Sequence, residues 1–135
     1  MKKLNCILLV DDDISTNFLH KKILQKAEVA EEILVALNGK EAIDYLAGNY
    51  EKSAGENPQP DLILLDINMP LMDGWEFLNE YKNLEMKKDA IIIVMLTTSL
   101  NPDDRLRAET IPEISGFQSK PLSFDMLTDI LEDHF

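Results

Sequence analysis

The feature that most constrains this sequence is a short apolar run that stops abruptly at an acidic residue. Leu62–Leu65 places four apolar residues in succession directly before Asp66. Such a run, bounded by turn signals, is typical of a strand buried on both faces. Pro70 and the pair Asp73-Gly74 follow, which favours a loop after the strand. We therefore expect a strand at residues 61–66 with Asp66 at the carboxyl edge of a sheet, where a carboxylate can react rather than merely pack.

Four further segments are expected to form strands, and polar residues follow each of them. The segments are Leu4–Val10, Ile33–Leu37, Ala90–Leu96 and Ser115–Ser119. Apolar residues at helical spacing predict helices in the intervening sequence. The helices are expected at Ile14–Ala27, at Lys40–Ala47, at Asp73–Leu84, from Asn101 to a stop at Pro112, and at Ser123–Phe135. Most of the polar, Gly- and Pro-containing stretch Gly48–Pro60 is expected to be a mobile surface loop or a frayed extension of the preceding helix.

This alternation of strands and helices predicts βαβ units, and hence a parallel sheet with right-handed crossovers. Five strands and five helices suit an α/β fold, a three-layer doubly wound sandwich. Ligands of such sheets bind outside the carboxyl ends of the strands. The length of 135 residues suits a single domain over residues 1–135.

Composition excludes several classes of function. The net charge of −12 argues against nucleic acid or an anionic membrane as the main partner, since both require a basic face. The single Cys6 excludes an internal disulfide and fits a reducing compartment. The apolar run that ends at Val10 is too short for a signal peptide or a membrane span. We expect a cytoplasmic protein in which Cys6 is a buried, inert thiol.

The predicted strands deliver a set of chemically matched side chains to one edge of the sheet. The set consists of Asp11, Asp12, Asp66, Thr97 and Lys120. Carboxylates brought close together repel one another unless a cation neutralises them, and hard oxygen ligands beside an open crevice suit Mg²⁺. An aspartate at such a site can act as a nucleophile toward phosphorus and form an acyl phosphate. The lysine ammonium and the threonine hydroxyl can then bind phosphoryl oxygens.

Four motifs carry a resemblance to a known family. They are Leu9-Val10-Asp11-Asp12, Leu64-Leu65-Asp66-Ile67-Asn68-Met69-Pro70 with Asp73-Gly74, Leu96-Thr97, and Lys120-Pro121. Together they resemble the receiver domain of two-component response regulators, of the stand-alone chemotaxis type, and the resemblance covers the whole chain. It implies a flavodoxin-like (βα)5 receiver fold with strand order 2-1-3-4-5, and no output domain.

The resemblance also implies roles for individual residues. Asp66 would accept a phosphoryl group from a sensor histidine kinase or a phosphotransfer protein. Mg²⁺ would be held by Asp12 and Asp66 through their carboxylates, by Asn68 through its backbone carbonyl, and by Asp11 largely through bound water. Thr97 and Lys120 would bind the phosphoryl group.

Signalling, on this resemblance, would proceed by a shift of Thr97 and an inward rotation of Phe117; the alternative role for Phe117 is that of a core aromatic. The Lys120-Pro121 peptide bond would be cis.

The resemblance further implies that the protein is a phosphoacceptor switch rather than an enzyme, catalysing only its own phosphorylation and dephosphorylation. It would act as a monomer or weak homodimer, and it would control an unknown downstream protein or relay phosphate onward. Asn68 and Ser99 would tune hydrolysis of the acyl phosphate.

Two other functions use similar parts. A phosphatase of the haloacid-dehalogenase type also has a strand-end Asp, Mg²⁺, Thr and Lys, but it needs a second acid two residues after the nucleophile, where this chain has Asn68. A nucleotide- or flavin-binding module would need a glycine-rich turn after the first strand, where this chain has three aspartates.

The remaining polar and aromatic residues receive structural roles. Asp13 or Ser15 is expected to cap the first helix. His20 and His134 are expected to be solvated helix residues, and Trp75 and Tyr81 to be packing residues.

Overall fold

A computed structural model describes residues 3–47, 59–84, 91–98 and 101–135. Strands and helices alternate along the chain, as the sequence predicts. Their order is β1 (Leu4–Val10), α1 (Ile14–Ala27), β2 (Ala30–Ala36), α2 (Gly39–Ala47), β3 (Leu62–Leu65), α3 (Gly74–Tyr81), β4 (Ile92–Thr97), α4 (Pro102–Glu109), β5 (Ile114–Ser119) and α5 (Phe124–His134).

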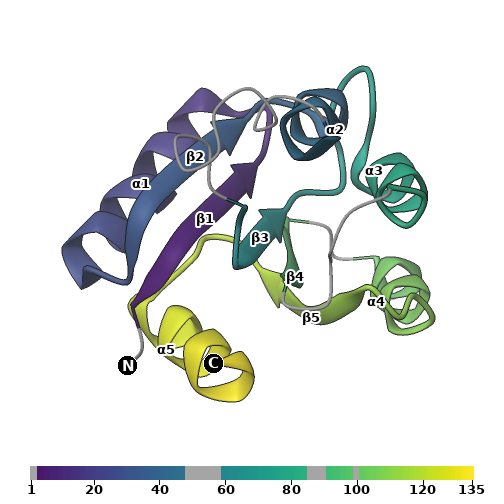
Figure 1. The fold of residues 1–135 in the computed structure, drawn as a ribbon. Coiled ribbons are helices and arrows are strands. Elements are labelled where there is room, and N and C mark those ends of the chain that lie inside the picture. Colours follow the sequence, from purple (N-terminus) through teal and green to yellow (C-terminus); the bar gives the residue numbers. More distant parts are fainter. Residues whose placement is uncertain (1–2, 48–58, 85–90, 99–100) are drawn as a thin grey trace.

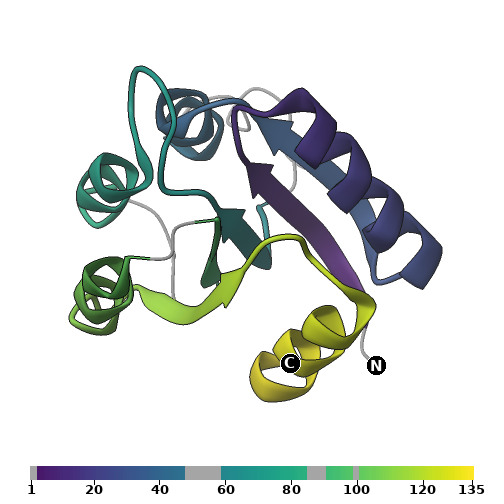
Figure 2. The ribbon, with the colours of Figure 1, turned by 180° about the vertical axis from the view of Figure 1, so that it is seen from behind.

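The five strands form one parallel sheet in the order β2-β1-β3-β4-β5, shown in Figure 1, which confirms the predicted fold class and strand order. Helices cover both faces of this sheet. One core cluster contains buried residues of α2, α3 and α4, and the second contains buried residues of α1 and α5. Figure 2 shows the same layers from behind.

The apolar runs explain why β1, β3 and β4 lie inside the sheet. Successive residues of a strand point to opposite faces. In β1, Leu8 and Val10 belong to one core cluster, while Ile7 and Leu9 belong to the other. A continuous apolar run is therefore required wherever both faces are covered. By contrast β2, at the edge of the sheet, is exposed or half-buried at every residue except Ala36, and it contains two exposed glutamates.

Helix starts follow from capping residues. The Asp13 carboxylate accepts hydrogen bonds from the backbone N–H groups of Ser15 (2.9 Å) and Thr16 (3.3 Å), as expected of the α1 cap. Asp73 and Glu76 form a capping box at the start of α3. These caps fix where each helix begins after its loop.

Several expected boundaries differ from the structure. β2 begins at Ala30, three residues earlier than expected, because the pairing of Leu4 with Ala30 extends the ladder with β1 beyond the apolar residues. α3 ends at Tyr81 rather than Leu84, and β4 extends to Thr97, which pairs with Ser119. Most of the expected surface loop, residues 48–58, lies outside the described residues.

The orientation of α1 places apolar side chains outside and polar ones inside. Ile14 and Phe18, two of the apolar residues at helical spacing in this segment, are 73% and 65% exposed. His20, expected to be solvated, is only 2% exposed, and Asn17 is also buried. Asn17 Nδ2 and His20 Nε2 each have a backbone partner beneath the helix, which apolar spacing alone could not reveal. Leu24 continues the same buried face into the core cluster shared with α5.

Candidate functional site

Three carboxylates lie together at the carboxyl edge of the sheet. Asp11 follows β1 and Asp66 follows β3, and backbone bonds from Asp11 N to Ala36 O (3.0 Å) and from Asp66 N to Val10 O (2.9 Å) fix both positions. Carboxylate oxygens of Asp11, Asp12 and Asp66 lie within 4.8 Å of one another. Asp66 is 7% exposed and Asp11 is also buried, whereas Asp12 is exposed. The cluster is thus held rigidly on one side and open to solvent on the other.

Lys120 places a positive charge inside this cluster. Its ammonium group forms a close ion pair with Asp11 Oδ2 and lies 3.4 Å from Asp66 Oδ1. Its backbone N–H donates to the carbonyl of Thr97 (2.9 Å), so the end of β5 is held against the end of β4. The following Lys120–Pro121 peptide bond is cis, as the sequence resemblance implied.

The electrostatics of Asp66 follow from these neighbours. Burial raises the pKa of the Asp66 carboxyl above its ordinary value. The Lys120 ammonium opposes that rise, and the Asp11 carboxylate adds to it. The cluster contains three carboxyl groups and one ammonium group, which pairs with two of them, so its ionised form is net negative and favours an additional cation.

The polar residues at the neighbouring strand ends occupy the same edge. Thr97, the last residue of β4, is 1% exposed and lies opposite Ser119 in the register of β5. Asn68 is exposed in the loop that follows β3. Ser99 lies outside the described residues. Phe117 lies two residues before the end of β5, half-buried, with the Arg105 guanidinium carbon 5.6 Å from its ring centroid.

Gly74 allows α3 to begin directly against the loop that bears Asp66. Its N–H donates to the carbonyl of Ile67 (2.7 Å). A Cβ atom at this position would lie 2.5 Å from the Asp66 carbonyl oxygen and 3.0 Å from the Ile67 Cα. Glycine is therefore required by close backbone approach.

Two residues near the site escaped prediction from the sequence. Asn17 Nδ2 donates to the carbonyl oxygen of Asp11 (2.7 Å), and His20 Nε2 accepts a hydrogen bond from the backbone N–H of Leu122 (3.2 Å). The sequence did contain one indication of their burial. Residues spaced three and four apart share one helix face, and this spacing places Asn17 and His20 on the same face as the apolar Leu24.

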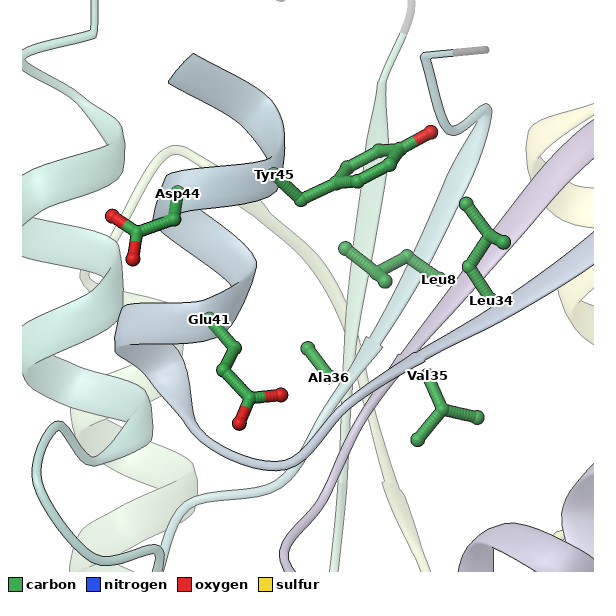
Figure 3. A pocket seen from close by; sticks show the side chains of 7 residues that line it. All are labelled: Leu8, Leu34, Val35, Ala36, Glu41, Asp44 and Tyr45. Atoms are coloured by element: carbon green, nitrogen blue, oxygen red, sulfur yellow. The ribbon is translucent and has the colours of Figure 1, made fainter. Parts of the chain in front are cut away.

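The hollow shown in Figure 3 is a different place. It has a volume of about 360 Å³ and lies between β2 and α2. Two carboxylates on its rim already have partners: Glu41 accepts from the backbone N–H of Leu37 (3.0 Å), and Asp44 pairs with Lys40 (3.6 Å). None of its seven lining residues belongs to the acidic cluster, so the candidate site is the open sheet edge.

Within the described parts of the chain, no helix combines the length and apolar character needed to cross a bilayer.

Comparison with known proteins gives a consistent result. The sequence model of the response regulator receiver domain matches residues 7–132. Response regulator Rcp1 of Synechocystis is 41% identical over 101 residues, an alignment that covers 73% of this chain and 65% of Rcp1. The chain thus spans just under two thirds of that relative.

Solved structures show the same likeness. A two-component response regulator from Cytophaga hutchinsonii has a TM-score of 0.83 and 30% identity, over 98% of this chain and 97% of that one. The Mn²⁺-bound form of response regulator Rcp1 has a TM-score of 0.72 and 32% identity, over 96% and 90% of the respective chains.

Proposed function

Since this chain belongs to the response regulator receiver domain family of two-component signal transduction, we propose that Asp66 is the residue that accepts the phosphoryl group. Members of this family are phosphoacceptor signalling proteins and are not generally catalytic enzymes. Family membership favours this function over the phosphatase and nucleotide-binding alternatives. The observation that carries the proposal is the position of Asp66 at the end of β3, beside two other carboxylates and 3.4 Å from the Lys120 ammonium.

The proposed reaction is a direct transfer between side chains. A carboxylate oxygen of Asp66 attacks the phosphorus of a phosphohistidine on a histidine kinase or a phosphotransfer protein. An O–P bond forms, the N–P bond breaks, and its electron pair returns to the imidazole nitrogen of the donor. The product is an aspartyl phosphate, whose hydrolysis would restore the carboxylate. Catalysis is then limited to the protein's own phosphorylation and dephosphorylation.

The donor set of the site fits a divalent cation, which receiver domains bind. Clustered carboxylate oxygens with one solvent-exposed member suit a hard cation that retains water, and we propose Mg²⁺. Asp11, Asp12, Asp66 and the backbone carbonyl of Asn68 would hold it. When bound, the cation would offset the repulsion between the anionic carboxylate and the incoming phosphoryl group.

Lys120 and Thr97 are proposed to hold the transferred group. Lys120 already pairs with the Asp66 carboxylate. Its ammonium would therefore be close enough to pair with the phosphoryl oxygens once Asp66 is phosphorylated. Thr97 ends the neighbouring strand and offers a hydroxyl at the same edge. We further propose that Thr97 and Phe117 change position together on phosphorylation, and that this change is read by a downstream protein. Partners of the family are histidine kinases and downstream effectors.

Phosphorylation of the intact chain tests the proposal. The protein is incubated with Mg²⁺ and acetyl phosphate, weighed intact, and the modified residue is mapped. We expect one added phosphoryl group, dependent on Mg²⁺ and labile to hydroxylamine, and none on Asp66→Asn. Asp61→Asn is the matched control, because Asp61 lies at the other end of β3, where it accepts a hydrogen bond from Asn5 N (2.7 Å). Equal labelling of Asp66→Asn and the parent protein would overturn the assignment.

A further inference from the structure

The inward face of α1 carries two polar side chains, and each of them forms a hydrogen bond with the backbone at or near one member of the ion pair. Asn17 Nδ2 donates to the Asp11 carbonyl oxygen (2.7 Å). One turn later, His20 Nε2 accepts from the backbone N–H of Leu122 (3.2 Å). Asp11 and Lys120 form the closest ion pair of the cluster. The same helix therefore contacts the backbone of Asp11 and the chain just beyond Lys120.

The segment from Lys120 to Leu122 is fixed at both of its ends. The N–H of Lys120 donates to the Thr97 carbonyl (2.9 Å), which ties the segment to β4. The N–H of Leu122 donates to His20, which ties it to α1. Leu122 and His20 are each 2% exposed, so water does not compete for this hydrogen bond. The path of the backbone between these two anchors decides where the Lys120 side chain starts.

We infer that His20 is a positioning residue for Lys120: its Nε2 atom holds the chain after β5 so that the Lys120 ammonium lies against Asp11 and Asp66. This inference rests on the proposed phosphoryl transfer to Asp66. His20 itself touches neither carboxylate through any described hydrogen bond.

A purely space-filling role would not require histidine at this position. An apolar side chain of similar size would fill the volume but leave the Leu122 N–H buried without an acceptor, which is costly. The acceptor role requires the neutral imidazole with its proton on Nδ1. Burial lowers the pKa of His20, and the Lys120 ammonium lowers it further, although the Asp11 carboxylate opposes both. The environment thus preserves the acceptor form at neutral pH.

The geometry can be tested directly, without any phosphorylation. Long-range ¹H–¹⁵N correlation spectra of the intact protein report which imidazole nitrogen carries the proton. We expect His20 in the Nδ1-protonated neutral form at pH 7, with a hydrogen-bonded, slowly exchanging Leu122 amide. His134→Gln removes the second histidine and assigns the remaining signal. A proton on Nε2 of His20 would overturn the inference.

The consequence for Lys120 requires a comparison of variants. His20→Leu removes the acceptor, whereas His20→Gln retains one, because the Gln Oε1 atom can take the place of Nε2. We expect the rate constant for phosphorylation by acetyl phosphate with Mg²⁺ to fall about fivefold in His20→Leu and to recover to within about twofold of the parent in His20→Gln. In a Lys120→Ala background, His20→Leu should have no further effect.

The outcomes separate this inference from the proposed function. A parent protein that is not phosphorylated on Asp66 contradicts the proposed function, while the tautomer measurement still tests the hydrogen bond. A parent that is phosphorylated, with His20→Leu reacting at the parental rate, contradicts the positioning role alone. Equal losses in His20→Leu and His20→Gln, or a loss in His20→Leu that persists in the Lys120→Ala background, would show that His20 acts by packing and would also contradict it.

Discussion

At Gly74 the backbone passes so close to the backbone of Asp66 that only glycine fits. A Cβ atom there would lie 2.5 Å from the Asp66 carbonyl oxygen, and a backbone atom cannot move aside as a flexible side chain can. We expect Gly74→Ala to lower the free energy of unfolding by roughly 2 kcal/mol or more, as overpacking against a fixed group does. Chemical denaturation measures the change.

Gly116→Ala provides the matched control for that substitution. The three atoms nearest to its Cβ would be two Val94 side-chain atoms at 3.4 Å and 3.6 Å and His134 Nε2 at 3.9 Å, which are ordinary contacts. Alanine also orders a strand position better than glycine does, so this variant should be neutral or slightly more stable. Equal denaturation midpoints for the two variants would contradict the role given to close backbone approach at Gly74.

Sequence reasoning succeeded for single residues wherever a polar residue follows an apolar run. Asp11, Asp66 and Lys120 were expected at one edge because parallel strands end together, and they do lie together. His20 was missed because its partner, Leu122, is 102 positions away, and a helix pattern contains no information about a backbone N–H so distant. Hydrogen-bond partners that join distant segments emerge only once the sheet order is known.

At the scale of elements, the contact between α1 and the segment after β5 predicts a pH dependence. The pKa of His20 is below its ordinary value in the folded protein, so near pH 6.5 the unfolded chain binds more protons than the folded one. Stability from this group is complete above the unfolded pKa and is lost as the pH falls from about 6.5 toward the folded pKa. The groups that face His20 from other elements are Asp11 and Lys120.

The measurement compares unfolding free energies of the parent and His20→Gln between about pH 7.5 and pH 5. The parent should lose more stability than the variant, by at most about 1.4 kcal/mol for each pH unit, because Gln does not titrate in this range. The carboxylates are common to both proteins and cancel in the difference. Identical pH profiles would show that His20 titrates as it does in an unfolded chain.

Among the helices and strands, the sequence predicted best the strands that are buried on both faces of the sheet. The interior strands β1, β3 and β4 are apolar on both faces, so their existence was evident from the sequence. Helix α1 was found with the correct bounds, but its apolar spacing did not reveal its orientation, because Ile14 and Phe18 lie on its exposed side while Asn17 and His20 lie beneath it. Apolar spacing identifies a helix, but here the buried face also carries polar residues whose partners lie just after β1 and after β5.

The whole molecule carries an excess of negative charge, and a small part of it is clustered at one edge of the sheet. The net charge of the chain is −12, and carboxylate oxygens of Asp11, Asp12 and Asp66 lie within 4.8 Å of one another. A ligand that binds only the folded state adds stability that grows with its concentration, about 2.7 kcal/mol at one hundred times its Kd. We therefore expect Mg²⁺ to raise the Tm in thermal denaturation, beyond the effect of NaCl at the same ionic strength.

Two substitutions that each remove one negative charge test whether the rise in Tm comes from Mg²⁺ binding at the cluster. Asp12→Asn should abolish most of the Mg²⁺-specific rise in Tm, because it removes one carboxylate of the cluster. Asp103→Asn, on the exposed first turn of α4, changes the net charge equally and should leave the rise intact. Loss of the rise in both variants would indicate a general effect of charge rather than a site.

The contact between α3 and α4 gives the molecule an optical property. Trp75 is the single tryptophan of the chain, and the Arg107 guanidinium carbon lies 4.3 Å from its ring centroid. Because an indole's excited state responds to a nearby charge, emission from this one ring would depend on the position of the arginine that covers it. The protein therefore contains a native fluorophore at the junction of two helices, on the helix that starts eight residues after Asp66, and needs no attached dye.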